Sequence, residues 1–396
     1  MSHRPMFLHG LLALGVLLAA APAARAWDED SPNLAWSNNK SSVTPEGNLS
    51  LHGDFSNECV TATLDKMPAH EFLQISVQLL ILRSWDGLAR TNGGGRMGPD
   101  FFRMGLDDGR TLAHACFSNT PVLAGFTPAA AWQTYPSPVP GDRVPYMTGS
   151  DFKNTFGYTF PKEGNQPPII VRQDALYTLK MTVPHTGEKV ALKFSGMGLQ
   201  DISDESWGVT AVRIVPRTRN QMGMQGYGEK DLYDTFIDGD GNEYKILSAP
   251  SYGRLLQTAA GRDAMAANEA FWKLVAAGDG TAAYLAKAVK PVAVDSAKIA
   301  ALAAPLYEDA PPTDETDARI QALVKLGVTA EPVLRDQRID RNEVPARLDW
   351  ALMEAGVMPV EDADVRQWIV ATRILEAIGT AEAKKARAGL IAAPKK

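Results

Sequence analysis

The sequence predicts two structural classes in one chain, an all-β sandwich or jelly roll followed by an all-α region. From about Asn33 to Pro216 the chain is rich in Gly, Pro, Thr and aromatic residues, and its apolar residues come in short runs, as in β-strands. From about Arg262 onward Ala, Leu, Glu, Lys and Arg dominate, and apolar residues recur three and four positions apart, as in amphipathic helices. The length of 396 residues exceeds what one core usually holds, so we expect two domains.

The β half divides into strands that are separated by turn residues. The Asp108-Gly109 pair is a hairpin signal between two alternating runs. A second alternating run reaches Pro184 and resumes at Val190 after Gly187, which predicts another hairpin. Strands spaced in this way favour a sandwich or jelly roll over a parallel sheet. The predicted strands are 59–64, 72–82, 102–106, 112–117, 177–183 and 190–194.

The helical half carries apolar stripes that end at glycines, as helices commonly do. The stripes lie at 270–275, 320–326, 348–352 and 368–378, and Gly327, Gly356 and Gly379 follow the last three of them. Short helices with such stops predict helical hairpins. The break at Pro311-Pro312 indicates a loop between helix pairs.

The first residues are typical of a secretory signal peptide. Arg4 precedes an apolar run from Leu11 to Ala21, and Ala24-Arg25-Ala26 supplies the small residues of a cleavage site. The run is shorter than the roughly 20 residues that span a bilayer. We therefore expect a mature chain without a transmembrane segment that begins near Trp27 and is secreted or periplasmic, and an uncleaved anchor is the alternative.

These boundaries divide the chain into four parts. They are a signal peptide at 1–26, a β-sandwich domain at 27–216, a linker with a β-hairpin at 217–261 and a helical domain at 262–396. The net charge of −6 argues against a general nucleic-acid binder, which would present a basic surface.

Cys59 and Cys116 are the only cysteines, and both fall in predicted strands of a chain bound for an oxidising compartment. This combination predicts one disulfide between them. Two free buried thiols are the alternative.

The β half resembles a family of secreted bacterial jelly-roll domains related to carbohydrate-binding and galactose-binding-like modules. The likeness lies in Gly53-Asp54-Phe55 with the strand after it, in 81–87 with Ser84-Trp85-Asp86-Gly87, in Gly98-Pro99-Asp100-Phe101, and in 199–214 with the Asp-Glu-Ser-Trp-Gly turn. The resemblance implies a ligand-binding sandwich and, at Asp86, Asp204 and Glu205, a structural calcium ion. The alternative is that these carboxylates cap turns.

The helical half resembles a HEAT-like module found in large bacterial multi-domain chains. The likeness lies in 271–274, in Tyr284-Leu285 with Lys290-Pro291-Val292, in 330–334 and in 373–383. The spacing departs from that module at 340–360, so the number of helix pairs is open. The resemblance implies a scaffold that contacts another protein.

Trp132 and Tyr135 are the candidate sugar platform, because they lie in a Pro-rich segment between strands and an aromatic face can stack on a pyranose. Burial in the core is the alternative for both rings. Trp85 and Trp207 fit the core better. The histidines, among them His70 and His185, are scattered, and no catalytic constellation is recognisable.

We therefore expect an exported non-enzymatic binding or scaffold protein, in which the sandwich recognises a glycan or cell-surface component and the helices dock a protein. One alternative is a structural or assembly protein of the cell envelope that binds proteins through both domains. Another is a carbohydrate-active enzyme that uses a carboxylate pair.

Overall fold

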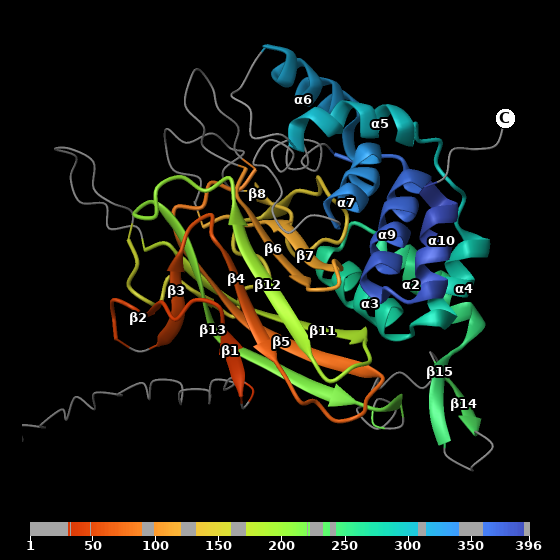
Figure 1. The fold of residues 1–396 in the computed structure, drawn as a ribbon, viewed down its shortest axis with the longest axis horizontal. Coiled ribbons are helices and arrows are strands. Elements are labelled where there is room, and N and C mark those ends of the chain that lie inside the picture. The colour runs from red at the N-terminus through yellow and green to blue at the C-terminus, as the bar shows by residue number, and fades with distance from the viewer. Residues whose placement is uncertain are drawn as a thin grey trace, which may run out of the picture.

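The structure is a computed structural model, and it describes residues 31, 33–47, 49–88, 99–119, 132–159, 172–219, 221, 233–237, 243–307, 314–339 and 359–391. Antiparallel sheets form the N-terminal part and helices form the C-terminal part (Figure 1), so the predicted division into a β half and an α half is confirmed. The predicted signal peptide, residues 238–242 of the predicted linker, the Pro311-Pro312 break and residues 340–358, where the helix spacing is irregular, lie outside the described residues.

Two antiparallel sheets make the β half. The first has the order β1 (Leu34–Trp36), β4 (Cys59–Leu64), β12 (Val190–Met197), β6 (Phe101–Leu106) and β7 (Thr111–Cys116). The second has the order β10 (Phe152–Lys153), β11 (Asp174–Pro184), β5 (Phe72–Arg83), β13 (Glu205–Arg217), β3 (Ser50–Phe55) and β2 (Ser41–Val43). Short strands β8 (Trp132–Gln133) and β9 (Val144–Pro145) pair with each other.

The predicted hairpin at 177–194 is wrong. β11 pairs with β5 and β10 in the second sheet, whereas β12 pairs with β4 and β6 in the first. The turn at Pro184 and Gly187 therefore carries the chain across the sandwich from one sheet to the other. The predicted hairpin at Asp108-Gly109 is confirmed, because β6 and β7 pair directly.

The core explains the long strand β5. Its residues Leu73, Ile75, Val77, Leu79 and Ile81 are buried in the main hydrophobic cluster, as their alternation predicted. The opposite face of the same strand carries Leu80 and Leu82, which pack in a separate cluster that includes residues of the 152–158 segment. Both faces of β5 are therefore covered, and β11 and β13 pair with its two edges, so β5 is a central strand of the sheet.

The described helices are α2 (Ala249–Ala259), α3 (Ala264–Ala276), α4 (Asp279–Ala288), α5 (Ser296–Ala303), α6 (Asp314–Leu326), α7 (Glu331–Ile339), α9 (Ala363–Ile378) and α10 (Ala381–Ile391). The 3-10 turns Ala304–Tyr307 and Gly327–Ala330 follow α5 and α6. Aspartates at 263, 295 and 362 cap α3, α5 and α9, each accepting a backbone N–H of the first turn. Gly379 ends α9 at a φ of 69°, where glycine is favoured. Before α2, β14 (Tyr233–Ile237) and β15 (Glu243–Leu247) pair as a hairpin. No helix in the described ranges has the length and apolar character to cross a bilayer.

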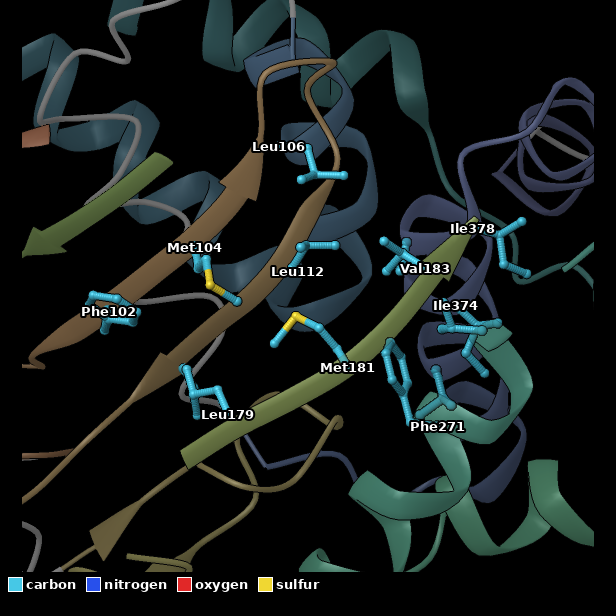
Figure 2. Packing of buried hydrophobic residues seen from close by; sticks show 14 of the residues in the cluster. Phe102, Met104, Leu106, Leu112, Leu179, Met181, Val183, Phe271, Ile374 and Ile378 are labelled. Carbon is cyan, nitrogen blue, oxygen red and sulfur yellow. The ribbon is translucent and has the colours of Figure 1, made fainter. Parts of the chain in front are cut away.

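The helices pack directly on the sandwich. Figure 2 shows Met181 and Val183 of β11 beside Phe271 of α3 and Ile374 and Ile378 of α9. All five side chains are buried and belong to one cluster that continues into the space between the sheets. Burial of this apolar surface holds the two halves together.

Polar contacts fix the orientation of this interface. The Arg366 guanidinium binds the Asp142 carboxylate through two bonds, Nη1 to Oδ1 at 2.5 Å and Nη2 to Oδ2 at 2.9 Å. Arg110 of the β6–β7 turn donates from Nη1 to the carbonyls of Ala377 at 3.3 Å and Ile378 at 3.1 Å, which are at the C-terminal end of α9. Such directed bonds are satisfied in only one relative position of the two halves.

Candidate functional site

The residues of the predicted calcium site meet in part. Asp86 follows β5, Glu205 begins β13, and both carboxylates interact with that of Asp100, just before β6. Asp204 also interacts electrostatically with Glu205, and it accepts a hydrogen bond from the Ser84 hydroxyl. Within the described part of the chain, no group of three or more His, Cys, Asp or Glu side chains has an arrangement suited to a metal ion. Calcium at this place stays a prediction.

Asp100 and Glu205 form a buried acid pair that was not predicted from the sequence. Both are fully buried, and a backbone N–H reaches one oxygen of each: Asp86 N–H to Asp100 Oδ2, and Gln200 N–H to Glu205 Oε2 at 2.6 Å. Burial, and then the nearby Glu205 and Asp86 carboxylates, raise the pKa of Asp100 well above its usual value. Burial raises the pKa of Glu205 as well, so a protonated pair is favoured over two buried negative charges. The available signal was the Gly98-Pro99-Asp100 passage of the family resemblance.

The two aromatic residues of the predicted sugar platform are half-buried in different surroundings. The Tyr135 ring stacks on Phe117, with centroids 4.9 Å apart and planes at 22°, and meets Tyr177 edge to face. Trp132 packs against a small cluster that contains Phe101. One face of Tyr135 is thus covered, and its ring lines a small cavity of about 70 Å³ between the sandwich and α3. A platform role for either ring stays a prediction.

The predicted disulfide does not form. Cys59 is exposed at the start of β4 and Cys116 is buried at the end of β7, and both thiols are free. Strands β12 and β6 lie between β4 and β7 in the sheet. Neighbouring strands are about 4.8 Å apart, so three steps separate the two Cα atoms by roughly 14 Å, well beyond the 7 Å that a disulfide can bridge.

Beside the interface lies a cavity of about 820 Å³, which we call the sandwich–helix cleft. The sandwich contributes the start of β5, the β6–β7 turn and the β11–β12 turn, and the helical half contributes α2, the α3–α4 junction and the α9–α10 junction. Its lining includes Glu71, Phe72, Asp107, Asp108, Arg110, His185, Thr186, Lys189, Arg219, Tyr252, Lys273, Asp279 and Thr380. These residues come from segments far apart in the sequence, and no local pattern groups them.

The charges that line the cleft are balanced. Arg110 pairs with Asp108 at 2.8 Å and Arg219 with Glu71 at 3.6 Å, both pairs within the lining. Lys189 and Lys273 pair with acids outside the lining, at 3.8 Å and 2.9 Å. The cleft therefore offers both hydrogen-bond donors and acceptors, and its lining does not carry a single sign of charge.

Two histidines that looked scattered in the sequence meet at this cleft. His70 Nε2 lies 2.9 Å from His185 Nδ1, and His70 Nδ1 lies 2.7 Å from the Pro68 carbonyl oxygen. His70 is buried, and His185 is half-buried in the cleft wall. Desolvation, then Arg110 and His70, lower the pKa of His185, so this ring is neutral at pH 7.

No protein-family model matches this chain, and no curated protein is similar to it at a significant level. Its function is therefore inferred from the arrangement of residues in the fold.

Proposed function

We propose that the chain is an exported, non-enzymatic recognition protein that binds a glycan or a cell-surface component in the sandwich–helix cleft. The observation that carries this proposal is the lining, which both halves share and in which donors and acceptors are balanced. A sugar hydroxyl donates and accepts at once, and it therefore suits such a lining better than a ligand with a strong net charge does.

The dimensions and the aromatic residues of the cleft agree with a small saccharide. Its volume of about 820 Å³ lies within the roughly 300–1,000 Å³ that small-ligand sites occupy. Phe72 and Tyr252 add apolar surface among the charged side chains. The Tyr252 ring is held by stacking on Tyr284, with centroids 5.3 Å apart and planes at 17°, so its position is fixed before a ligand arrives.

The finer assignments belong to the same proposal. The sandwich would be a jelly roll of the carbohydrate-binding kind, secreted or periplasmic, with a structural calcium near Asp86 and Glu205. The helices would be a HEAT-like module that docks a protein. Among the helix side chains that the structure describes, Met265 is the one large hydrophobic side chain that is exposed, so this docking role rests on the resemblance alone. The buried pair of Asp100 and Glu205 offers no groove to a substrate, and it lends no support to the enzymatic alternative.

A glycan-array screen of the full chain tests the proposal. Thr186 is exposed in the β11–β12 turn and lines the cleft, so Thr186→Trp should obstruct the cleft and abolish binding. Glu188 is exposed in the same turn and does not line the cleft, so Glu188→Trp is the matched control and should bind normally. Saturable binding that Thr186→Trp leaves intact would place the glycan elsewhere, with Trp132 and Tyr135 the next positions to substitute. An array that gives no binding to the folded wild-type chain would refute the glycan proposal.

A further inference from the structure

The hydrogen bonds of the histidine pair determine where its protons lie. A carbonyl oxygen only accepts, so the His70 nitrogen that faces Pro68 O, Nδ1, carries the proton. In the neutral ring the other nitrogen, Nε2, then has a lone pair and accepts from Nδ1–H of His185. The ring centroids are 5.2 Å apart and the ring planes differ by only 5°, which agrees with an N–H···N bond from the edge of one ring to the edge of the other. Neutral His185 is therefore left with a lone pair on its own Nε2.

One added proton changes Nε2 of His185 from a hydrogen-bond acceptor to a donor. If His185 takes the proton, both of its nitrogens carry hydrogen. If His70 takes it, His70 Nε2 donates to His185 Nδ1, and neutral His185 then carries its hydrogen on Nε2. Either way Nε2 of His185 becomes a donor. A second proton would place two N–H groups against each other across the 2.9 Å contact, so the pair accepts one proton while this bond lasts.

We propose that His185 sets the ligand class of the cleft: its Nε2 accepts a hydrogen bond from a hydroxyl of an uncharged sugar and disfavours the carboxylate of a uronic acid. This inference rests on the proposed glycan-binding function. A carboxylate is acceptor-only and meets the Nε2 lone pair without a hydrogen, whereas a hydroxyl can turn its hydrogen toward it. When the pair is protonated the preference reverses, because an N–H with a positive charge beside it favours the carboxylate.

Charged groups from both halves of the chain surround the pair. Among the side-chain types, histidine is the one whose ordinary pKa lies between about pH 5 and 8. The groups concerned are Asp107, Asp108 and Arg110 of the β6–β7 turn, Glu71 beside His70, Lys189 of the β11–β12 turn, Arg219 after β13, Lys273 of α3 and Asp279 of α4. Since the pKa of His185 is lowered, the reversal should fall below about pH 6.5.

The test compares the neutral oligosaccharide that the full chain binds best with its uronic acid counterpart, by isothermal titration at pH 8 and pH 5. The neutral sugar should bind about tenfold more tightly at pH 8, the penalty for an unsatisfied acceptor, and should lose that advantage at pH 5. In His185→Gln, whose amide does not titrate, the ratio of the two affinities should not depend on pH. His52→Gln, which changes a half-buried histidine outside the cleft lining, should behave as wild type.

Nitrogen-15 NMR of the imidazoles in the same protein checks the proton positions without any ligand. At pH 8 the His185 hydrogen should be on Nδ1, and finding it on Nε2 would overturn the inference. A neutral sugar that binds with an affinity ratio unaffected by pH or by His185→Gln would overturn the inference and leave the proposed function standing. If no sugar of either kind bound the wild-type chain, both the proposed function and the proposed ligand preference of His185 would be refuted.

Discussion

Breaking the buried ion pair between Asp142 and Arg366 should lower the stability of the protein more than breaking an exposed ion pair does. Both side chains are buried, and the guanidinium also donates from Nε to the Ala260 carbonyl at 2.8 Å and from Nη2 to the Gly261 carbonyl at 2.6 Å. Asp142→Ala removes the carboxylate that neutralises this cation directly. Breaking a buried pair in this way costs about 3–5 kcal/mol, because the remaining charge is left buried without its partner. We expect the free energy of unfolding to fall by that amount.

Equilibrium urea unfolding, followed by far-UV circular dichroism and tryptophan fluorescence, measures the change. The control is Asp65→Ala, which removes an exposed partner 3.8 Å from Lys189 and should cost less than about 1 kcal/mol. The double variant Asp142→Leu with Arg366→Met should recover most of the loss, since apolar side chains of similar volume need no counter-charge. If Asp142→Ala destabilised the protein no more than Asp65→Ala does, the reasoning about the buried pair would be refuted.

Three further predictions concern the acid pair and the cysteines. Burial raises the folded-state pKa of Asp100, so the wild-type protein loses stability as pH rises above the unfolded value of about 3.9. The free energy of unfolding of Asp100→Asn should therefore exceed that of wild type by about 1 kcal/mol or more at pH 7 and should not exceed it at pH 3.5. Thermal unfolding at the two pH values measures this difference, and an equal pH dependence of the two proteins would contradict it. If calcium binds at this place, it should raise the melting temperature of wild type and not of Asp100→Asn, and equal shifts in both would locate the ion elsewhere. Ellman's reagent should titrate one thiol in the folded protein, exposed Cys59, and two after unfolding, because burial shields Cys116 and raises its pKa; no reactive thiol in the unfolded protein would instead indicate a disulfide.

The local pattern of the sequence predicted single elements well. The alternation in residues 72–82 predicted β5 and the face that it buries, because a two-residue period is a property of the strand itself. The helix stop at Gly379 was equally local, since the left-handed conformation there favours glycine over any other residue.

The partners of each strand were not predictable in the same way. A run that ends at Pro184, turns at Gly187 and resumes at Val190 looks the same whether the two strands pair or join opposite sheets. The choice depends on which distant strands have room beside β5 and β4, and that is decided by the whole fold. The error about the cysteines has the same origin, because the two strands between Cys59 and Cys116 come from other parts of the chain.

The site was predictable only where the contributing residues lay in recognisable turns. Asp86 and Glu205 lie in passages that carry the family resemblance, and their carboxylates interact in the fold, while their role as calcium ligands stays a prediction. The cleft instead collects single residues from many turns and helix ends. His70 and His185 are 115 positions apart, and no spacing rule connects them.

The contacts between the two halves also bear on how the cleft would bind. The hydrophobic attraction between β11 and α9 is not directional, whereas hydrogen bonds to particular carbonyls are. Arg110 donates both to Pro184 O at 2.7 Å, in the turn that carries His185, and to Ile378 O, at the end of α9. The Arg110 guanidinium thus connects two walls of the cleft, one from each half. A side chain on Gly379 would approach Arg110 Cδ to 2.2 Å, so the glycine is required for this contact as well as for the helix end. The width of the cleft is therefore fixed by the same bonds that join the halves, and a ligand would meet a preformed site without the cost of ordering it.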